Sequence, residues 1–342
     1  MKSNYKGKQT VKFKNKPKII SNYALVGGKE GDGPFREYFD HILKNDLFGE
    51  KSYEKAERKM LETAIFNSIE KAKLKPENID CLISGDLLNQ IISSSFSARH
   101  FDTSFIGLYG ACSTMAESLA IGATLIDGNY FNTVACATAS HFSSVEKQFR
   151  FPLELGNQRT PVSQWTVTGS ACTILSHTGS NIAITSATFG KVTDYGINDV
   201  NNMGAAMAPA AMSTLIAHFN ETNTSPKDFD LIVTGDLGKL GSEILMDLME
   251  KEGYPLGENY NDCGQMIFSK KQRVYQGGSG AGCSATVLNA YILNKMKKGD
   301  FKKVLFCATG ALLSPLSSQQ GESIPGIAHA IVIEREEEKN VT

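Results

Sequence analysis

The amino-acid sequence predicts an α/β fold made of two duplicated halves whose buried helices lie between two sheets. Two blocks of sequence that recur, each at its own constant offset along the chain, predict the duplication. Helices that are apolar on almost every face predict that sheets cover them on both sides. The composition fits a globular protein, because 41% of the 342 residues are hydrophobic and 21% are charged.

The first repeated block is a helix stop followed by an apolar strand. PENIDCLISGDL at 76–87 resembles PKDFDLIVTGDL at 226–237, at an offset of 150 residues. A proline precedes the strand in each copy and ends the helix before it. The sequence Gly-Asp-Leu follows each strand, so both copies are expected to turn in the same way.

The second repeated block begins at a cysteine and ends in another apolar strand. GACSTM at 110–115 resembles AGCSAT at 281–286, and TVACATAS at 133–140 resembles VLFCATGA at 304–311, both at an offset of 171 residues. The longer offset implies an insertion between the two blocks of the second half. The alternative interpretation is that both blocks are ordinary strand–helix turns of similar composition.

The first half is expected to contain an amphipathic helix, a buried helix and three strands. Apolar residues at helical spacing, such as Met60 and Ile65, predict the amphipathic helix over 54–72. Residues 113–126 are apolar almost all round, which predicts a buried helix that ends at Gly128. The strands of this half are expected at 79–84, 132–139 and 169–176.

The second half is expected to repeat this series of elements. They are a helix at 208–220, a strand at 229–234, a helix at 284–298, a strand at 303–309 and a closing strand at 326–334. The chain then divides into a basic N-terminal arm at 1–20, an N-terminal half at 21–178 and a C-terminal half at 179–342.

The net charge of −1 conceals a strongly basic N-terminus. The rest of the chain is acidic, with 28 basic and 36 acidic residues, so nucleic-acid binding is not expected. The arm is expected to be a flexible tail, with attraction to an anionic membrane surface as the alternative. Its lysines are Lys2, Lys6, Lys8, Lys12, Lys14, Lys16 and Lys18.

The seven cysteines indicate free thiols in a reducing compartment. Their number is odd and no Cys-x-x-Cys motif occurs, so neither a disulfide framework nor a zinc site is expected. A signal peptide is not expected either, because the N-terminus lacks an apolar stretch. Residues 160–190 lack charged side chains but contain several polar ones, so a membrane span is not expected there.

The order of these elements resembles the thiolase superfamily, and most closely the ketoacyl-carrier-protein synthases of the initiating type. The matching features are the helix at 54–72, the Pro-x-x-Ile-Asp sequence at 76–80 and the Ala-Cys-Ser turn at 111–113. The resemblance covers residues 20–335, nearly the whole chain. It implies a thiolase-like, five-layered αβαβα sandwich built from two duplicated βα halves.

A narrower resemblance lies in TASHFSSVEKQFRFPLELGNQRTPVSQWTVTGSACTILS at 138–176, which is similar to the stage V sporulation protein AD family of endospore-forming bacteria. It implies non-catalytic binding of pyridine-2,6-dicarboxylate (dipicolinate), alone or as its calcium chelate, for uptake into the developing spore. The implied partners are other proteins of the same spore channel system and a second copy of the chain. The implied location is the cytoplasmic side, peripheral to the forespore or spore inner membrane, with a link to spore germination.

Cys112 is the most informative single residue for chemistry. A thiol at a helix N-terminus is expected to feel the positive end of the helix dipole, which lowers its pKa. That position suits a covalent nucleophile or an anion-binding site. A third interpretation is an inherited packing cysteine, because Cys283 occupies the equivalent place in the other half.

The catalytic partners of the resembling enzymes are missing from this sequence. Those enzymes carry a His after the strand that here ends at Thr234, where this chain has Gly-Asp-Leu at 235–237. They carry an Asn or His ahead of the last buried helix, where this chain has the glycine-rich string 277–282. A thiol without a base is a poor nucleophile. The sequence therefore predicts no catalytic residue, no cofactor and no metal site.

Two alternatives remain open at this point. One is a ketoacyl synthase or acyltransferase that uses Cys112 as its nucleophile. The other is a purely structural interaction protein in which the pocket is vestigial.

The predicted ligand site combines the Cys112 turn with the segment that follows the next strand. A planar dicarboxylate needs cationic side chains or clustered N–H groups to replace its water. The stretch 146–159 offers cations, although contact between two copies is its alternative role, and the glycine string offers N–H groups. The candidate ligand-binding residues are Cys112, Ser113, His141, Lys147, Arg150, Arg159, Gly278 and Ser279.

Overall fold

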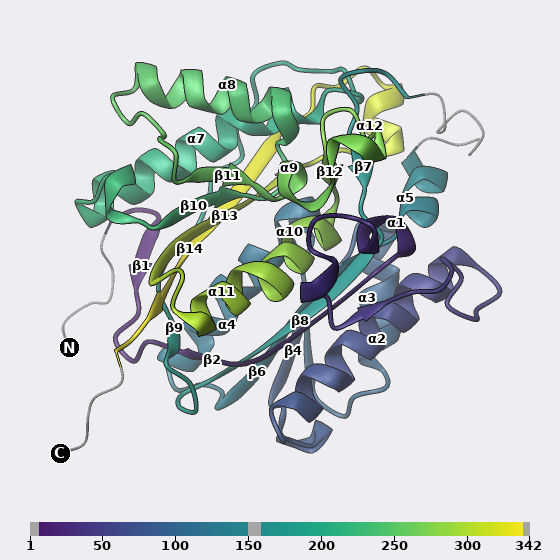
Figure 1. Cartoon of the computed structure of the whole chain (residues 1–342), viewed down its shortest axis with the longest axis vertical. Helices are drawn as coiled ribbons and strands as arrows, with labels where there is room; N and C mark the ends of the chain where they lie inside the picture. The colour runs from purple at the N-terminus through teal and green to yellow at the C-terminus, as the bar shows by residue number, and fades with distance from the viewer. Residues whose placement is uncertain (1–6, 150–158, 338–342) are drawn as a thin grey trace.

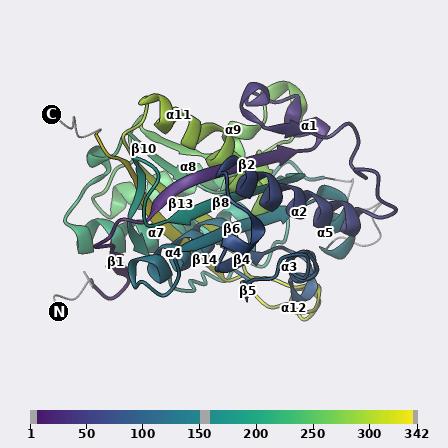
Figure 2. The same cartoon turned by 90° about the horizontal axis from the view of Figure 1, so that it is seen from below.

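The computed structural model describes residues 7–149 and 159–337 and has a layered architecture. In Figure 1, helices α7 and α8 form one outer layer, and helices α2 and α3 form the other. Helices α4, α10 and α11 lie between the two parts of the sheet. Figure 2 views the molecule from the side of α2 and α3. Arg150, one of the candidate ligand-binding residues, lies outside the described residues.

The bounds of the elements follow the chain order. The first part contains β1 (Thr10–Lys12), β2 (Lys18–Val26), α1 (Gly28–Gly31), β3 (His41–Ile42), α2 (Tyr53–Lys71), β4 (Cys81–Gly85), α3 (Ile92–Ala98), β5 (Ser104–Gly107), α4 (Thr114–Asp127), β6 (Thr133–Ser140), α5 (Phe142–Phe149), β7 (Trp165–Thr166) and β8 (Gly169–Ser176). The second part contains β9 (Ile182–Thr188), α7 (Met203–Thr222), β10 (Leu231–Thr234), α8 (Gly238–Lys251), β11 (Tyr260–Asp262), α9 (Cys263–Ile267), β12 (Gly278–Ser279), α10 (Ala281–Val287), α11 (Leu293–Lys298), β13 (Lys303–Ala311), α12 (Pro315–Gln319) and β14 (Gly326–Arg335).

The main sheet contains the same strand order twice. One half runs β5-β4-β6-β8-β2, and the other runs β11-β10-β13-β14-β9. In each half the first three strands are parallel and the last two join on by antiparallel pairing. A single residue pair, Lys18 with Ala183, connects the halves through β2 and β9. This repeated order confirms the duplication that the sequence predicted.

An aspartate just before β4 and its counterpart just before β10 form equivalent hydrogen bonds in the two halves. The carboxylate of Asp80 accepts hydrogen bonds from the backbone N–H groups of Asn132 and Thr133, at 2.7 and 3.0 Å. The carboxylate of Asp230 accepts the equivalent bonds from Lys302 and Lys303, at 2.6 and 2.8 Å. Each bond satisfies a backbone donor where a strand begins, which explains why the aspartate occurs in both copies.

The central helices contain many small apolar residues because sheet covers them on both sides. Ala116, Ala120 and Ala123 of α4 are fully buried. Gly122 faces β6, and a Cβ atom added there would lie 2.8 Å from the sulfur of Cys136. Larger side chains would push the layers apart, so the apolar pattern read from the sequence reflects this packing.

Two predicted helices differ from their expected bounds. The helix expected at 208–220 begins at Met203, because the side chain of Asn202 caps its first turn and Pro209 is tolerated in the second turn. The helix expected at 284–298 begins at Ala281 and passes through a π-helical turn at Leu288–Ile292.

The N-terminal arm also differs from its expected state. A flexible tail is the wrong description from residue 7 onward, because β1 pairs antiparallel with β9. The carboxylate of Glu221 accepts the backbone N–H of Thr10 at 2.7 Å and of Lys8 at 2.8 Å. The prediction missed β1 because a short strand rich in lysine has no apolar alternation to reveal it.

Close backbone approach at Gly310 is expected to be essential for stability. A Cβ atom built on Gly310 would overlap the carbonyl oxygen of Gly110, just before the Cys112 turn. The variant Gly310→Ala should therefore lower the free energy of unfolding by about 2 kcal/mol or more, measured by chemical denaturation. The matched control is Gly257→Ala, where the nearest atom is Asn259 Oδ1 at 3.5 Å. Equal stability of the two variants would contradict the packing described here.

Candidate ligand-binding site

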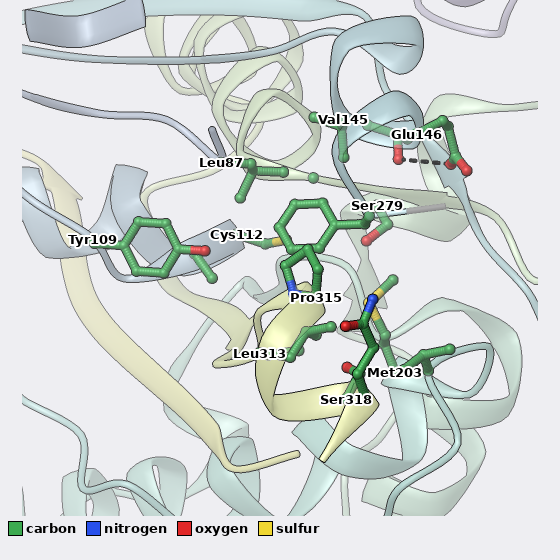
Figure 3. Close-up of a pocket in the computed structure, with 17 residues that line it drawn as sticks. Leu87, Tyr109, Cys112, Val145, Glu146, Met203, Ser279, Leu313, Pro315 and Ser318 are labelled. Atoms are coloured by element: carbon green, nitrogen blue, oxygen red, sulfur yellow. Dashed lines mark hydrogen bonds between the residues drawn. The ribbon is translucent and has the colours of Figure 1, made fainter. Parts of the chain in front are cut away.

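A pocket of about 170 Å³ lies where the two halves meet, beside the turn that contains Cys112. Figure 3 shows Leu87 and Val145 on one side of it, Leu313 and Met203 on the opposite side, and Cys112 with Ser279 between them. The lining is mostly apolar. The residues that line the pocket are Leu87, Tyr109, Ala111, Cys112, Val145, Glu146, Phe149, Thr166, Val200, Met203, Ser279, Gly280, Ala311, Leu313, Pro315, Ser318 and Gln319.

Cys112 lies in a short 3-10 turn, Ala111–Ser113, that leads into α4. Ala111 adopts a positive φ of 50°, which is uncommon for a residue with a side chain and marks a constrained turn. The turn is held by the opposite half, because Ser284 Oγ donates to the carbonyl of Cys112 at 3.4 Å. Cys112 is 6% exposed, so its thiol reaches the pocket without being open to bulk water.

Asp236 is the central polar residue beneath the pocket. Its carboxylate accepts hydrogen bonds from Ser279 Oγ at 2.7 Å, the Gly280 N–H at 3.1 Å and Thr309 Oγ1 at 2.8 Å. It also interacts with the thiol of Cys112. Burial raises the pKa of Asp236, while these hydrogen bonds lower it. The Ser279 hydroxyl and the Gly280 N–H could bind a ligand oxyanion, but here they donate to the carboxylate of Asp236.

The expected lowering of the Cys112 pKa is wrong. Burial raises the pKa of this thiol well above its usual range, and the nearby Asp236 carboxylate raises it further. The Gly280 N–H and the Ser279 hydroxyl act in the opposite direction, but they also serve Asp236. A negative neighbour in a dry site therefore outweighs the helix N-terminus.

Equivalent aspartates diverge between the two halves. Asp86, the first-half counterpart of Asp236, accepts the backbone N–H groups of Leu88 at 3.0 Å and Ser94 at 2.7 Å. It organises the local turn before α3, whereas Asp236 is directed at the Cys112 pocket. The aspartate is thus present in both halves, but its hydrogen-bond donors differ between them.

Of the four candidate residues in the glycine string and the Cys112 turn, two line the pocket and two do not. Cys112 and Ser279 line the pocket. Ser113 donates to the carbonyl of Gly110 at 2.6 Å, and Gly278 is buried next to Ser279 and accepts from Gln164 at 3.1 Å. These two residues support the wall without lining the pocket.

His141 is buried just before α5, and both of its ring nitrogens have hydrogen-bond partners within the protein. Its Nε2 lies 2.8 Å from the carbonyl oxygen of Asp46, and its Nδ1 accepts the Ser143 N–H at 3.2 Å. Burial lowers its pKa. His141 is not among the residues that line the pocket.

The two described cations of the 146–159 stretch have carboxylate partners. Lys147 is half exposed on α5, and its Nζ lies 2.7 Å from Glu54 of α2. The side chain of Arg159 is 6% exposed, with Nη1 3.3 Å from Glu146 Oε1 and its guanidinium 5.0 Å from the centre of the Trp165 ring. Glu146 lines the pocket and Arg159 does not, so Arg159 is connected to the pocket by its ion pair with Glu146.

Several pocket residues were not anticipated from the sequence. Tyr109 stands three residues before Cys112, and its position beside that turn was an available signal. Glu146 also lines the pocket, and a carboxylate among the cations of 146–159 gives no signal for an anion site. Leu313 and Ser318 come from the segment around α12, where nothing in the sequence indicates a site.

The described part of the chain contains no cluster of three or more His, Cys, Asp or Glu side chains arranged to hold a metal ion. All seven cysteines are free and buried. Within residues 7–149 and 159–337, no helix is long and apolar enough to cross a membrane.

Solved structures share this fold over nearly their whole length. The TM-score is 0.57 for 3-oxoacyl-[acyl-carrier-protein] synthase III from Aquifex aeolicus VF5, at 11% identity, covering 93% of this chain and 99% of that chain. It is 0.58 for human mitochondrial 3-ketoacyl-CoA thiolase in complex with CoA, at 11% identity, covering 94% and 98%. At such identities the likeness concerns the fold alone. The fold and the pocket cysteine define a thiolase-like protein.

The sequence places the chain more narrowly within this class. The family model of Stage V sporulation protein AD (SpoVAD) matches residues 7–334. Stage V sporulation protein AD of Bacillus subtilis (strain 168) is 44% identical over 329 residues, which are 96% of this chain and 97% of that protein. The chain therefore belongs to the stage V sporulation protein AD family and is a sporulation protein.

Asp236 is expected to keep the Cys112 thiol protonated near neutral pH. In Asp236→Asn the negative neighbour is removed, so the pKa of Cys112 should fall and its alkylation by iodoacetamide at pH 8 should accelerate about tenfold or more. Site-resolved mass spectrometry across a pH series measures this rate.

Ser279→Ala is the companion variant, because it removes one hydrogen bond and keeps the carboxylate. It should leave alkylation of Cys112 slow. An unchanged pH profile in folded Asp236→Asn would refute the role assigned to Asp236.

Proposed function

We propose that this protein binds dipicolinate in the Cys112 pocket without catalysis, for uptake of dipicolinate into the developing spore. The observation that carries the proposal is the position of Asp236, whose carboxylate accepts a hydrogen bond from Ser279 and raises the pKa of the Cys112 thiol. Family membership supports the sporulation context.

The loss of catalysis is supported by the electrostatics around Cys112. Condensing and thiolytic chemistry needs a thiolate, a base and donors for an oxyanion. Here the Cys112 pKa is raised by burial and by Asp236, which disfavours the thiolate. The Gly280 N–H and the Ser279 hydroxyl, which could stabilise an oxyanion, are occupied by Asp236. The site therefore favours binding over acyl transfer.

The shape of the pocket supports a small planar ligand. Leu87 and Val145 face Leu313 and Met203 across it, so a pyridine ring can be covered on both faces by apolar groups (Figure 3). Tyr109, Phe149 and Thr166 complete the lining with two aromatic rings and a hydroxyl group.

The charge of the lining favours the calcium chelate over the free dianion. Glu146 is the only formally charged side chain among the described lining residues, and a bare dianion would be repelled by it. Chelation by calcium neutralises the two ligand carboxylates, and Glu146 can offer an oxygen to the metal. Arg159, paired with Glu146 at 3.3 Å, can then shift part of its interaction to a ligand carboxylate.

The proposed setting is a spore channel system at the forespore or spore inner membrane. The protein would act on the cytoplasmic side, held there by other proteins of that system, and would deliver its ligand to the channel. Its lack of a membrane-crossing helix in the described residues is compatible with a peripheral position.

The proposal includes a homodimer that forms through the edge strand β5. Within residues 7–149 and 159–337 this strand ends one half of the sheet, so one of its edges has no neighbouring strand there. Ile92, Phe96, Phe105 and Tyr109 are exposed beside it. An apolar patch next to a free strand edge fits the same patch of a second copy.

Filling the pocket is expected to weaken ligand binding. In Leu313→Trp the larger side chain occupies space in the pocket, so calorimetric titration should show at least about a tenfold loss of affinity for dipicolinate, with and without calcium. Leu316→Trp is the matched control, because Leu316 is 64% exposed in the same segment and does not line the pocket.

Dipicolinate should bind the unmodified protein saturably and more tightly than an isomeric pyridine dicarboxylate. If Leu313→Trp and Leu316→Trp bind dipicolinate equally well, the ligand does not bind in the Cys112 pocket. A stable acyl adduct on Cys112 after incubation with acyl-coenzyme A would instead support the acyltransferase alternative.

Charge at the β5 edge is expected to separate the two copies. The protein should sediment as a dimer, and Phe105→Glu should sediment as a monomer, because a buried carboxylate at an apolar interface is costly. Tyr130→Glu is the control, since Tyr130 is 75% exposed and lies outside this patch. A monomeric parent protein, or a dimeric Phe105→Glu, would refute this interface.

A further inference from the structure

A second cavity, of about 250 Å³, lies on the α7 side of the sheet near the opposite end of β13 from Cys112. Lys303 lines this cavity and Ala311 lines the Cys112 pocket, and these two ends of β13 lie about 26 Å apart at the usual rise of a strand. The residues that line this cavity are Lys12, Phe13, Lys16, Thr185, Ser186, His218, Thr222, Thr224, Phe229, Lys303, Val332 and Glu334.

Three lysines from separate parts of the chain converge on this cavity. Lys12 ends β1, Lys16 follows in the connection to β2, and Lys303 begins β13. Lys303 Nζ lies 3.4 Å from Glu334, the one acidic residue of the lining. Lys16 Nζ lies 3.2 Å from Glu336. Lys12 has no carboxylate partner among the described residues, so the lining carries a net positive charge.

A buried histidine provides the second, independent observation. His218 of α7 is 1% exposed and lines the cavity. Its Nδ1 lies 2.8 Å from Thr188 Oγ1, which lies 2.9 Å from Thr10 Oγ1. Within the described part of the chain, no group pairs with the other ring nitrogen, Nε2. When Nδ1 accepts the Thr188 hydroxyl proton, Nε2 carries the ring proton and can donate it to a ligand.

The remaining lining fits an anion rather than a cation. Thr185 and Ser186 add hydroxyl groups from β9, and Phe13 and Phe229 add aromatic walls. Burial and the nearby Lys303 lower the pKa of His218 to about 4, so the ring is neutral at pH 7 and the positive charge belongs to the lysines. Ammonium groups, a ring N–H and hydroxyl groups together are donors suited to phosphate or carboxylate oxygens.

We propose that this cavity is a second ligand site that binds a phosphate or carboxylate group through Lys12, Lys303 and His218. The group can belong to a free small molecule or to the headgroup of an anionic lipid, because both present the same oxygens. This site is independent of the Cys112 pocket, so it stands whether or not dipicolinate binds there.

The test is a titration with inorganic phosphate at constant ionic strength, followed by the NMR signal of the His218 ring. The signal should shift saturably. Lys12→Ala and Lys303→Ala should each raise the half-saturating phosphate concentration about tenfold, because each removes a charge-assisted hydrogen bond.

Matched controls remove the same charge beside the cavity rather than within it. Lys14→Ala and Lys302→Ala alter neighbouring lysines that do not line it and should change half-saturation less than about twofold. Equal losses in both pairs of variants, or an unmoved His218 signal in the parent protein with every probe used, would overturn the proposal.

A second arm identifies the source of the anion. Glycerol phosphate and vesicles of phosphatidylglycerol are compared with vesicles of phosphatidylcholine, with the same four variants. Shifts with glycerol phosphate support a free small molecule. Binding confined to phosphatidylglycerol vesicles, with the same loss in Lys12→Ala and Lys303→Ala, supports a lipid headgroup. Vesicle binding that all four variants retain would count against this cavity.

Discussion

The middle layer of helices is the constraint on which the rest of the molecule depends. Because sheet covers α4 and α10 on both sides, most of their side chains are buried, and those that carry no charge predominate. The N-terminal turns of these helices meet at the boundary between the halves, where Gly310 and Gly110 come into backbone contact. That meeting point brings Cys112 of one half against Ser279 and Gly280 of the other. The pocket is therefore a consequence of how two duplicated halves pack.

Asp236 shows how a duplicated scaffold acquires a different site without a change of fold. Its counterpart Asp86 stabilises a turn through backbone N–H groups, whereas Asp236 gathers donors from β12, α10 and β13 beneath the pocket. A carboxylate placed there satisfies donors that would otherwise be buried without partners. It also makes the thiolate of Cys112 unfavourable, so the structural and chemical effects of one residue act together.

The two cavities differ in charge because different parts of the sheet form them. The Cys112 pocket lies where β13 ends, and its described lining is apolar with a single carboxylate, Glu146. The other cavity lies where β13 begins and collects lysines from the N-terminal arm, which β1 fastens to β9. The excess of lysine in the first eighteen residues is thus partly local to one cavity, which explains how a chain of net charge −1 can present a basic site.

The fold class, the duplication and the cysteine where the halves meet could be predicted from the sequence, because repeats and apolar periodicity are local signals. It also shows Gly-Asp-Leu at 235–237, where the resembling enzymes carry a histidine. The raised pKa of Cys112 could not be predicted in this way, because its causes, burial and the charge of Asp236, arise only when the chain is folded. The same holds for Leu313, which reaches the pocket from a distant segment, and for Lys12 and Lys303, which meet across separate strands. Contacts between residues far apart in sequence leave no periodic pattern from which they could be predicted.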